Sequence, residues 1–282
     1  MHFQAFALGI ALVGAMASAN AQWLNYPEPG TPLTREGKPN LSAKTPRTYD
    51  GKPDFSGVWQ IEPPPRGEIE RIFGDLGAAV VAGDDPRTFS KYFLNLLVDF
   101  KPGEEPIRPE AAALTQRRHQ TMDTPQSHCL PASIPAIELI GFPFKIFQTP
   151  AAIVIIYEAY GAFRQIHTDG RKLPVHPFPA WMGYSTGRWE GDTLVVETAG
   201  FNDRGWMDVA GHPRSESLRV QERFYRRDFG HLDVQATIED PKIFTKPITI
   251  KFTELLIPNS DILEFFCAEG ERDRAHMPTG NP

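Results

Sequence analysis

Hydrophobic and polar residues alternate over short segments in the second half of the chain, a pattern typical of β-strands with one buried face. A similar segment lies near the start of the chain. We expect strands over residues 55–59, 145–148, 152–159, 163–168, 182–189, 193–198, 218–226, 232–238, 248–256 and 262–267.

The connections between these segments predict how the strands pair. The turns at 190–192 and 229–230 are short and contain glycine, which favours antiparallel hairpins. Short turns leave no room for parallel crossovers, and a meander of this length must close to remove its edges. We therefore predict a mainly β fold: an antiparallel up-and-down, lipocalin-like β-barrel, favoured over a sandwich.

A different periodicity occupies residues 67–122. Apolar residues recur there at helical spacing in three segments, the second over 86–100 and the third over 109–122. We predict a helical insertion that follows the first strand and covers one end of the barrel.

The N-terminal residues suggest export. Residues 1–21 combine a short apolar run with an Ala19-Asn20-Ala21 step, typical of a secretory signal peptide, and the run is too short to span a membrane. Residues 22–54 lack an apolar period and predict an extended arm, disordered or lying on the surface. Residues 55–282 are expected to form one barrel domain, and the protein to be periplasmic or secreted, without a membrane span.

Cys129 and Cys267 are the two cysteines of the chain. Export favours their oxidation, so we predict one disulfide; a buried thiol or a nucleophilic cysteine are the alternatives.

Charge and missing motifs exclude several functions. The net charge is −6 and basic residues are scattered among acids, so no nucleic-acid partner is expected. Dinucleotide and Walker motifs are absent, and no HExxH or CxxC spacing occurs, so neither a cofactor nor a metal is predicted. A metal site assembled from distant strands stays open.

Two groups of polar residues could bind a ligand or carry chemistry. The first lies on and after the strand at 163–168, where Phe163, Gln165 and His167 share one face that could line a cavity. The second lies near the next strands. The expected catalytic residues are His167, Asp169, His212 and Asp203, and the expected ligand-binding residues are Arg164, Arg171, His176, Tyr184, Asn202 and Glu197. The alternative is that Asp169 and Arg171 only form turn hydrogen bonds and that the other charges face water.

The segments RQIHTDGR, WMGYSTGRWEGDTLVVETAGFND and GHPRSESLRVQERF, with the PDFSGVW opening, resemble a large family of uncharacterised exported bacterial proteins. This resemblance implies export and a β-rich, barrel-like fold. It implies no activity and no catalytic residue.

Three functions remain open at this point. The first is an exported small-molecule enzyme without cofactor, a lyase, isomerase or hydrolase. In it His167 or His212 moves a proton, Asp169 or Asp203 orients the imidazole, and Arg171 with Tyr184 binds negative charge. The second is a carrier of an apolar or ring-containing ligand, and the third is a structural partner in the envelope.

Overall fold

The computed structural model describes residues 26–65, 67–72, 74, 89–121, 124–265 and 267. The expected signal peptide lies outside these residues. Residues 26–54 contain turns and isolated bridges but no regular strand, and the Leu41 and Ala43 carbonyls accept the N–H groups of Gly230 and Phe229 in a turn of the barrel.

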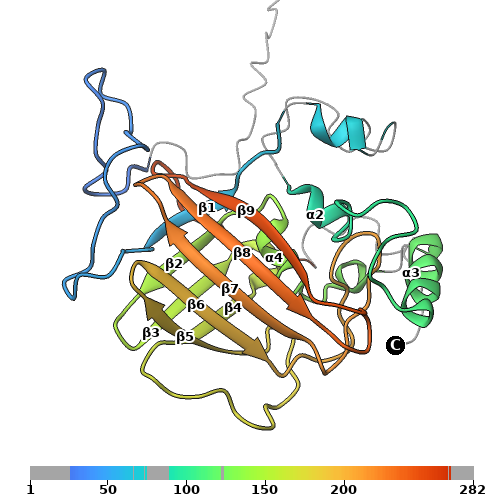
Figure 1. The fold of residues 1–282 in the computed structure, drawn as a ribbon. Coiled ribbons are helices and arrows are strands. Elements are labelled where there is room, and N and C mark those ends of the chain that lie inside the picture. The colour runs from blue at the N-terminus through green and yellow to red at the C-terminus, as the bar shows by residue number, and fades with distance from the viewer. Residues whose placement is uncertain are drawn as a thin grey trace, which may run out of the picture.

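Nine strands form a closed barrel in the described part of the chain, in the order of the sequence, with the last strand paired to the first (Figure 1). The predicted mainly β, largely antiparallel up-and-down barrel is confirmed. The strands are β1 Gly57–Ile61, β2 Phe144–Gln148, β3 Ala152–Tyr157, β4 Phe163–His167, β5 Tyr184–Glu190, β6 Thr193–Ala199, β7 Arg219–Arg226, β8 His231–Glu239 and β9 Ile248–Leu256.

One pair departs from the predicted antiparallel meander. β4 and β5 run parallel and share the partners Ile166↔Ser185 and His167↔Thr186. The connection between them, residues 168–183, is long enough to bring the chain back to the barrel end at which β4 began, so that β5 starts from that end too.

The predicted strand at 262–267 is wrong, because residues 261–265 form no strand. β9 already pairs with β1, so the closed barrel offers no free edge to a tenth strand.

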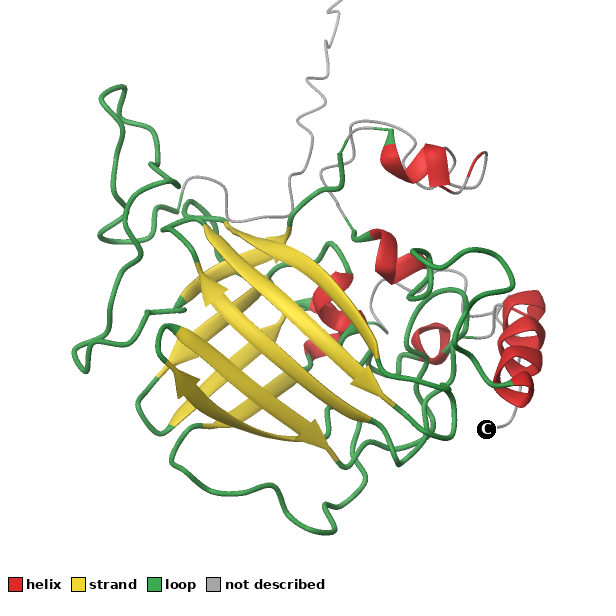
Figure 2. Cartoon of the chain, viewed as in Figure 1, coloured by secondary structure: helices red, strands yellow, loops and turns green. Residues whose placement is uncertain are grey.

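Most of the helical elements gather beside the barrel (Figure 2). The third predicted helix is confirmed over its described residues, and residues 68–72 are helical. The predicted helix over 86–100 is wrong in extent, because Asn95 ends α2 and its side chain accepts the Leu97 N–H in a local turn. The helical elements are α2 Lys91–Leu94, α3 Pro109–Thr121, η1 Pro125–His128, α4 Ala136–Leu139 and η2 Ala159–Gly161.

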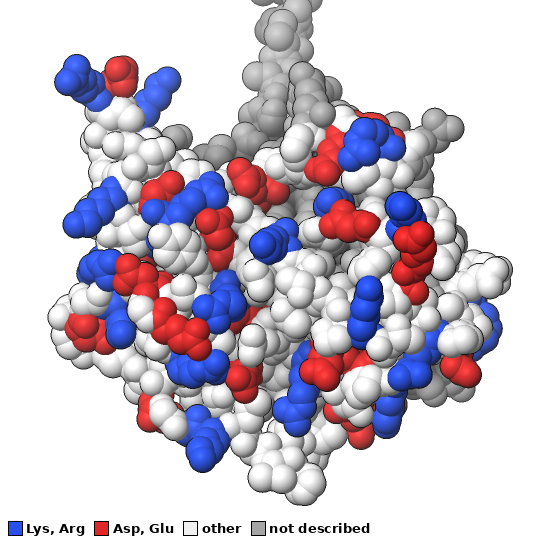
Figure 3. All heavy atoms as spheres, viewed as in Figure 1, with Lys and Arg blue, Asp and Glu red and all other residues white. Residues whose placement is uncertain are grey.

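The barrel interior is a packed core. On β8, Leu232, Val234, Ala236 and Ile238 are buried while the residues between them are not, as alternation along a strand requires. The surface shows the opposite composition: acidic and basic residues are interspersed on the face drawn in Figure 3.

The predicted disulfide is confirmed. Cys129 and Cys267 have Cα atoms 5.6 Å apart and join the loop after η1 to the segment that follows β9. A disulfide is typical of an oxidising, extracytoplasmic environment.

Candidate functional site

A cleft opens in the barrel wall beside β4. β5 pairs only with the last two residues of β4, so Phe163–Gln165 have no partner strand on that side. Gly183, just before β5, has φ +65° and passes so close to β6 that a Cβ would lie 2.9 Å from the Ala199 carbonyl oxygen. The chain therefore lies close to β6 where β5 begins, and it forms no ladder with the first half of β4.

This cleft, named here the β4–β5 cleft, has a volume of about 450 Å³. That size is in the range of small-molecule sites. Its walls are mostly aromatic and apolar, and Phe163 is 61% exposed within it. The lining residues are Pro131, Tyr160, Gly161, Ala162, Phe163, Arg164, Gln165, His167, Ala180, Trp181, Met182, Gly183, Tyr184 and Ser185.

Four of the predicted site residues form a chain of contacts at the edge of the cleft. The rings of His167 and Tyr184 lie 5.2 Å apart between centroids. Arg171 Nη1 donates to the Tyr184 hydroxyl at 3.2 Å, while Arg171 Nη2 donates to Asp169 at 2.6 Å. These four residues are part of the larger set of site residues expected from the sequence.

The predicted orientation of His167 by Asp169 does not occur. Both oxygens of Asp169 accept from the Arg171 guanidinium, and these hydrogen bonds lower the pKa of Asp169 to about 2. Among the described residues His167 has no hydrogen-bond partner for its imidazole, which is half-buried in the cleft. The turn interaction of Asp169 with Arg171, the alternative considered from sequence, is the one that forms.

Trp181, one wall of the cleft, is fixed from behind. Its carbonyl accepts from Ser133 Oγ at 2.5 Å and from Arg214 Nη1 at 3.2 Å. The Arg214 guanidinium also lies 5.6 Å from the indole centroid and donates to the Asn202 side chain at 2.6 Å. Asn202, predicted to bind ligand, instead holds the arginine that positions Trp181.

Arg164 is among the residues that line the cleft, but its side chain is buried in the barrel. All five of its N–H groups are used: they donate to Ser185, Thr198, Glu138 and twice to Glu222. No donor is left for a ligand, so the predicted ligand-binding role of Arg164 is wrong.

The interior around Arg164 is rich in acids. Burial, together with the charge of Glu222, raises the pKa of Glu138 well above its usual value, and Tyr157 donates to Glu138 at 2.9 Å. Burial alone lowers the pKa of Arg164, but the two glutamates outweigh it and raise the pKa. Glu254 lies within the same barrel with neither carboxyl oxygen hydrogen-bonded in the described structure, and burial raises its pKa strongly.

His212 is oriented by a carboxylate, but by Asp208 and not by the predicted Asp203. His212 Nδ1 lies 2.5 Å from Asp208 Oδ2, and the same carboxylate accepts the backbone N–H groups of Leu96 and Gly211. His212 is 6% exposed. This pair ties a loop to the end of α2, away from the residues that line the cleft.

The remaining predicted residues lie elsewhere. His176 is exposed and lines a separate hollow of about 430 Å³ beside Gly200. Glu197 bonds to Arg188 at 2.9 Å on the barrel exterior. Asp203 is exposed. Burial lowers the pKa of Arg214 to about 10, and the negative charge of Asp203 opposes part of this shift.

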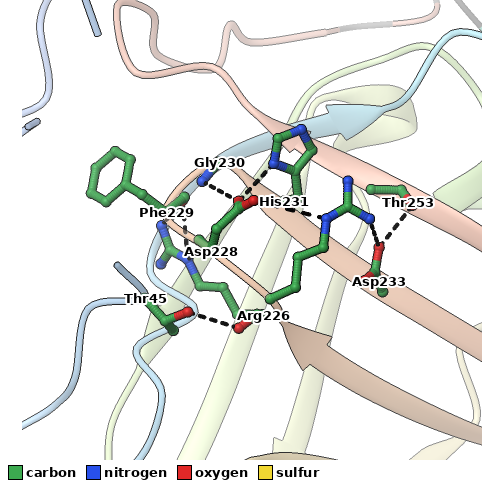
Figure 4. A network of polar contacts seen from close by, with 9 residues as sticks. Thr45, Arg226, Asp228, Phe229, Gly230, His231, Asp233 and Thr253 are labelled. Carbon is green, nitrogen blue, oxygen red and sulfur yellow. Dashed lines mark hydrogen bonds and ion pairs between the residues drawn. The ribbon is translucent and has the colours of Figure 1, made fainter. Parts of the chain in front are cut away.

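A second polar network stabilises the β7–β8 turn (Figure 4). His231 Nδ1 lies 2.6 Å from Asp228 Oδ1, which also accepts the Gly230 N–H at 3.1 Å. Thr45 of the N-terminal arm donates to the Arg226 carbonyl at 3.0 Å. The network joins the arm to the turn, and its histidine–carboxylate pair has a structural explanation.

In the described part of the chain, no three histidine, cysteine or acidic side chains gather as a metal site would require. Nor does any helix among the described residues have the length and apolar character that crossing a membrane demands.

Sequence reasoning missed Glu138, Tyr157, Glu254 and Arg214 as site or interior residues. Glu254 lies two residues before the buried Leu256 on β9, so the two side chains share one face of the strand. Alternation alone could therefore have predicted that Glu254 faces the barrel interior. Glu138 belongs to a four-residue helix, α4, and such a helix has no periodic signal.

Comparison of the chain with protein-family models, curated proteins and solved structures finds no match. The resemblance to exported bacterial proteins therefore stays a prediction.

Proposed function

We propose that the protein is exported and binds a small ring-containing molecule in the β4–β5 cleft. The observation that carries the proposal is the cleft wall. Tyr160, Phe163, Trp181 and Tyr184 surround one space large enough for a small molecule. Aromatic rings stack on a planar ligand and remove its apolar surface from water.

Polar groups at the edge of the cleft indicate what else the ligand carries. His167 has no partner in the described structure, and an imidazole can donate or accept a hydrogen bond. The Tyr184 hydroxyl accepts from Arg171, so its own proton is free to donate to a ligand oxygen. A ring bearing a hydroxyl, carbonyl or carboxylate group fits this edge.

Binding is favoured over catalysis because neither predicted histidine–aspartate pair forms. Asp169 is occupied by Arg171, and Asp208 holds His212 in a buried loop. Oxidising conditions, indicated by the disulfide, agree with a periplasmic or secreted carrier.

A titration with 1-anilinonaphthalene-8-sulfonate, an anionic ring compound that fluoresces in apolar sites, tests the proposal. Trp181→Ala and Phe163→Ala should each weaken binding about tenfold, the loss of one aromatic contact. Phe178→Ala is the matched control, because this phenylalanine is 89% exposed and does not line the cleft. Equal affinity in all variants would refute binding in the cleft.

An acid–base enzyme is the second candidate, favoured by one observation: the imidazole of His167, which has no hydrogen-bond partner among the described residues, lies against the Tyr184 ring. In this function His167 removes a proton from the bound molecule and Tyr184 donates one to its oxygen. Compounds that bind would be incubated with the protein and followed by NMR. His167→Gln and Tyr184→Phe should then abolish conversion while binding persists; an unchanged conversion rate in both would exclude this mechanism.

A further inference from the structure

The segment after β9 is fastened across the ends of β2 and β3. This segment, residues 257–265 with Cys267, is named here the C-terminal strap. Lys145 of β2 forms an ion pair with Asp261 at 2.9 Å, and the Leu263 N–H donates to Glu158 Oε2 at 3.0 Å. Both contacts hold the strap against the barrel.

The strap supports one wall of the β4–β5 cleft. The Phe265 ring meets the Tyr160 ring edge-on, with centroids 5.8 Å apart and planes at 82°. Phe142 packs on Phe265 at the same centroid distance, 5.8 Å. Tyr160 lines the cleft, so the strap fixes the position of a residue that a ligand would touch.

The disulfide connects this wall to a second one. Cys267 follows Phe265 by two positions, and Pro131, which lines the cleft, follows Cys129 by two positions. A single covalent bond between Cys129 and Cys267 therefore joins the segment that carries Pro131 to the strap that packs on Tyr160.

Backbone strain occurs at both of these places. In the described part of the chain, Cys129 (φ 57°) and Tyr160 (φ 61°) are the residues other than glycine with positive φ. A bulky side chain is rare in this conformation, which persists only where the surroundings enforce it. Phe265 packs on Tyr160, and the disulfide fastens the segment that carries Phe265.

We propose that the Cys129–Cys267 disulfide controls ligand affinity in the β4–β5 cleft, an inference that rests on the proposed function. With the bond closed, the strap holds Tyr160 as a wall. Reduction by an external dithiol breaks the S–S bond and releases the strap. Two electrons and two protons pass to the cysteines, which become thiols, and the dithiol becomes a disulfide.

The bond is accessible to such a reductant. Cys129 is exposed and Cys267 is half-buried, and thiolate attack on a disulfide requires this access.

The test compares the affinity of 1-anilinonaphthalene-8-sulfonate for the oxidised protein, the dithiothreitol-reduced protein and Phe265→Ala with its disulfide intact. Phe265→Ala removes the ring contact without cutting the covalent bond, so it reports on the strap even if reduction unfolds the chain. Both treatments should weaken binding about tenfold. Tyr49→Ala is the control, because Tyr49 is 90% exposed on the N-terminal arm. Circular dichroism checks that the barrel persists.

Unchanged affinity in a folded, reduced protein and in Phe265→Ala would overturn the inference. If the oxidised protein instead shows no binding that depends on Trp181, the proposed function fails. Amide hydrogen exchange then tests separately whether the disulfide holds the strap and Tyr160 in place. Reduction should then speed exchange at the β3–β4 turn, residues 158–162, and leave β7 and β8 unchanged. Equal exchange at the turn in both redox states would refute control by the disulfide.

Discussion

Replacing Glu254 by methionine should stabilise the protein. Glu254 is 1% exposed, and neither of its carboxyl oxygens has a hydrogen-bond partner in the described structure. A buried polar group left unsatisfied costs about 1–3 kcal/mol. Methionine has a similar length, fills the same space and brings no hydrogen-bonding requirement, so Glu254→Met should raise the free energy of unfolding by about 1–3 kcal/mol near neutral pH.

The gain should depend on pH in a defined direction. Burial raises the pKa of Glu254 in the folded state. In the unfolded chain a glutamate ionises near about 4.3. Above that pH the unfolded state loses a proton that the folded state keeps, so wild-type stability falls as pH rises toward the folded pKa. Glu254→Met lacks this loss, and its advantage should grow by up to about 1.4 kcal/mol per pH unit across this window.

Urea unfolding followed by tryptophan fluorescence, with the disulfide intact, measures both effects at acidic and neutral pH. Glu222→Met is the matched comparison, since Glu222 is equally buried but is the bidentate partner of Arg164. Removing it leaves a buried cation short of a partner and should destabilise the protein by about 3–5 kcal/mol. A destabilised Glu254→Met, or an advantage that does not change with pH, would contradict the expected cost of the buried Glu254 carboxyl group.

Three further substitutions test other parts of the structure. Arg164→Lys should lower the free energy of unfolding by about 3–5 kcal/mol in denaturant melts, because an ammonium cannot replace five N–H donors between buried acids; a wild-type midpoint would contradict the network. Gly183→Ala should cost more than Gly170→Ala in thermal melts, because both have positive φ but only Gly183 is closely packed; equal melting temperatures would contradict this packing. By NMR, the Asp169 carboxyl should titrate at a pKa of about 2 and rise toward its usual value in Arg171→Ala; an unchanged midpoint would remove that hydrogen bond as the cause.

Strands could be predicted where alternation was strong. β9 was predicted with both ends correct, because Ile248, Ile250 and Leu256 mark its inner face. The parallel pairing of β4 with β5 could not be predicted, since it depends on the path of residues 168–183, which have no periodicity. The cleft is a consequence of that pairing, so its position was also beyond the sequence.

The candidate site was predicted in part. His167, Asp169, Arg171 and Tyr184, four of the expected site residues, form a chain of contacts at the ends of neighbouring strands, whereas His212 and His176 lie elsewhere. The expected pairing of His167 with Asp169 is wrong, because the Asp169 carboxylate accepts hydrogen bonds from the nearby Arg171 guanidinium instead. For His212, the residue four positions earlier, Asp208, supplies the carboxylate through a tight turn at Gly211.

The most direct test of ligand binding is protein-observed NMR of the oxidised protein with a set of small ring-containing acids, phenols and ketones. Compounds that bind should shift the backbone amides of Phe163, His167, Trp181 and Tyr184 together, with saturation at one affinity. Shifts confined to other surfaces, or none across the whole set, would contradict binding in the β4–β5 cleft.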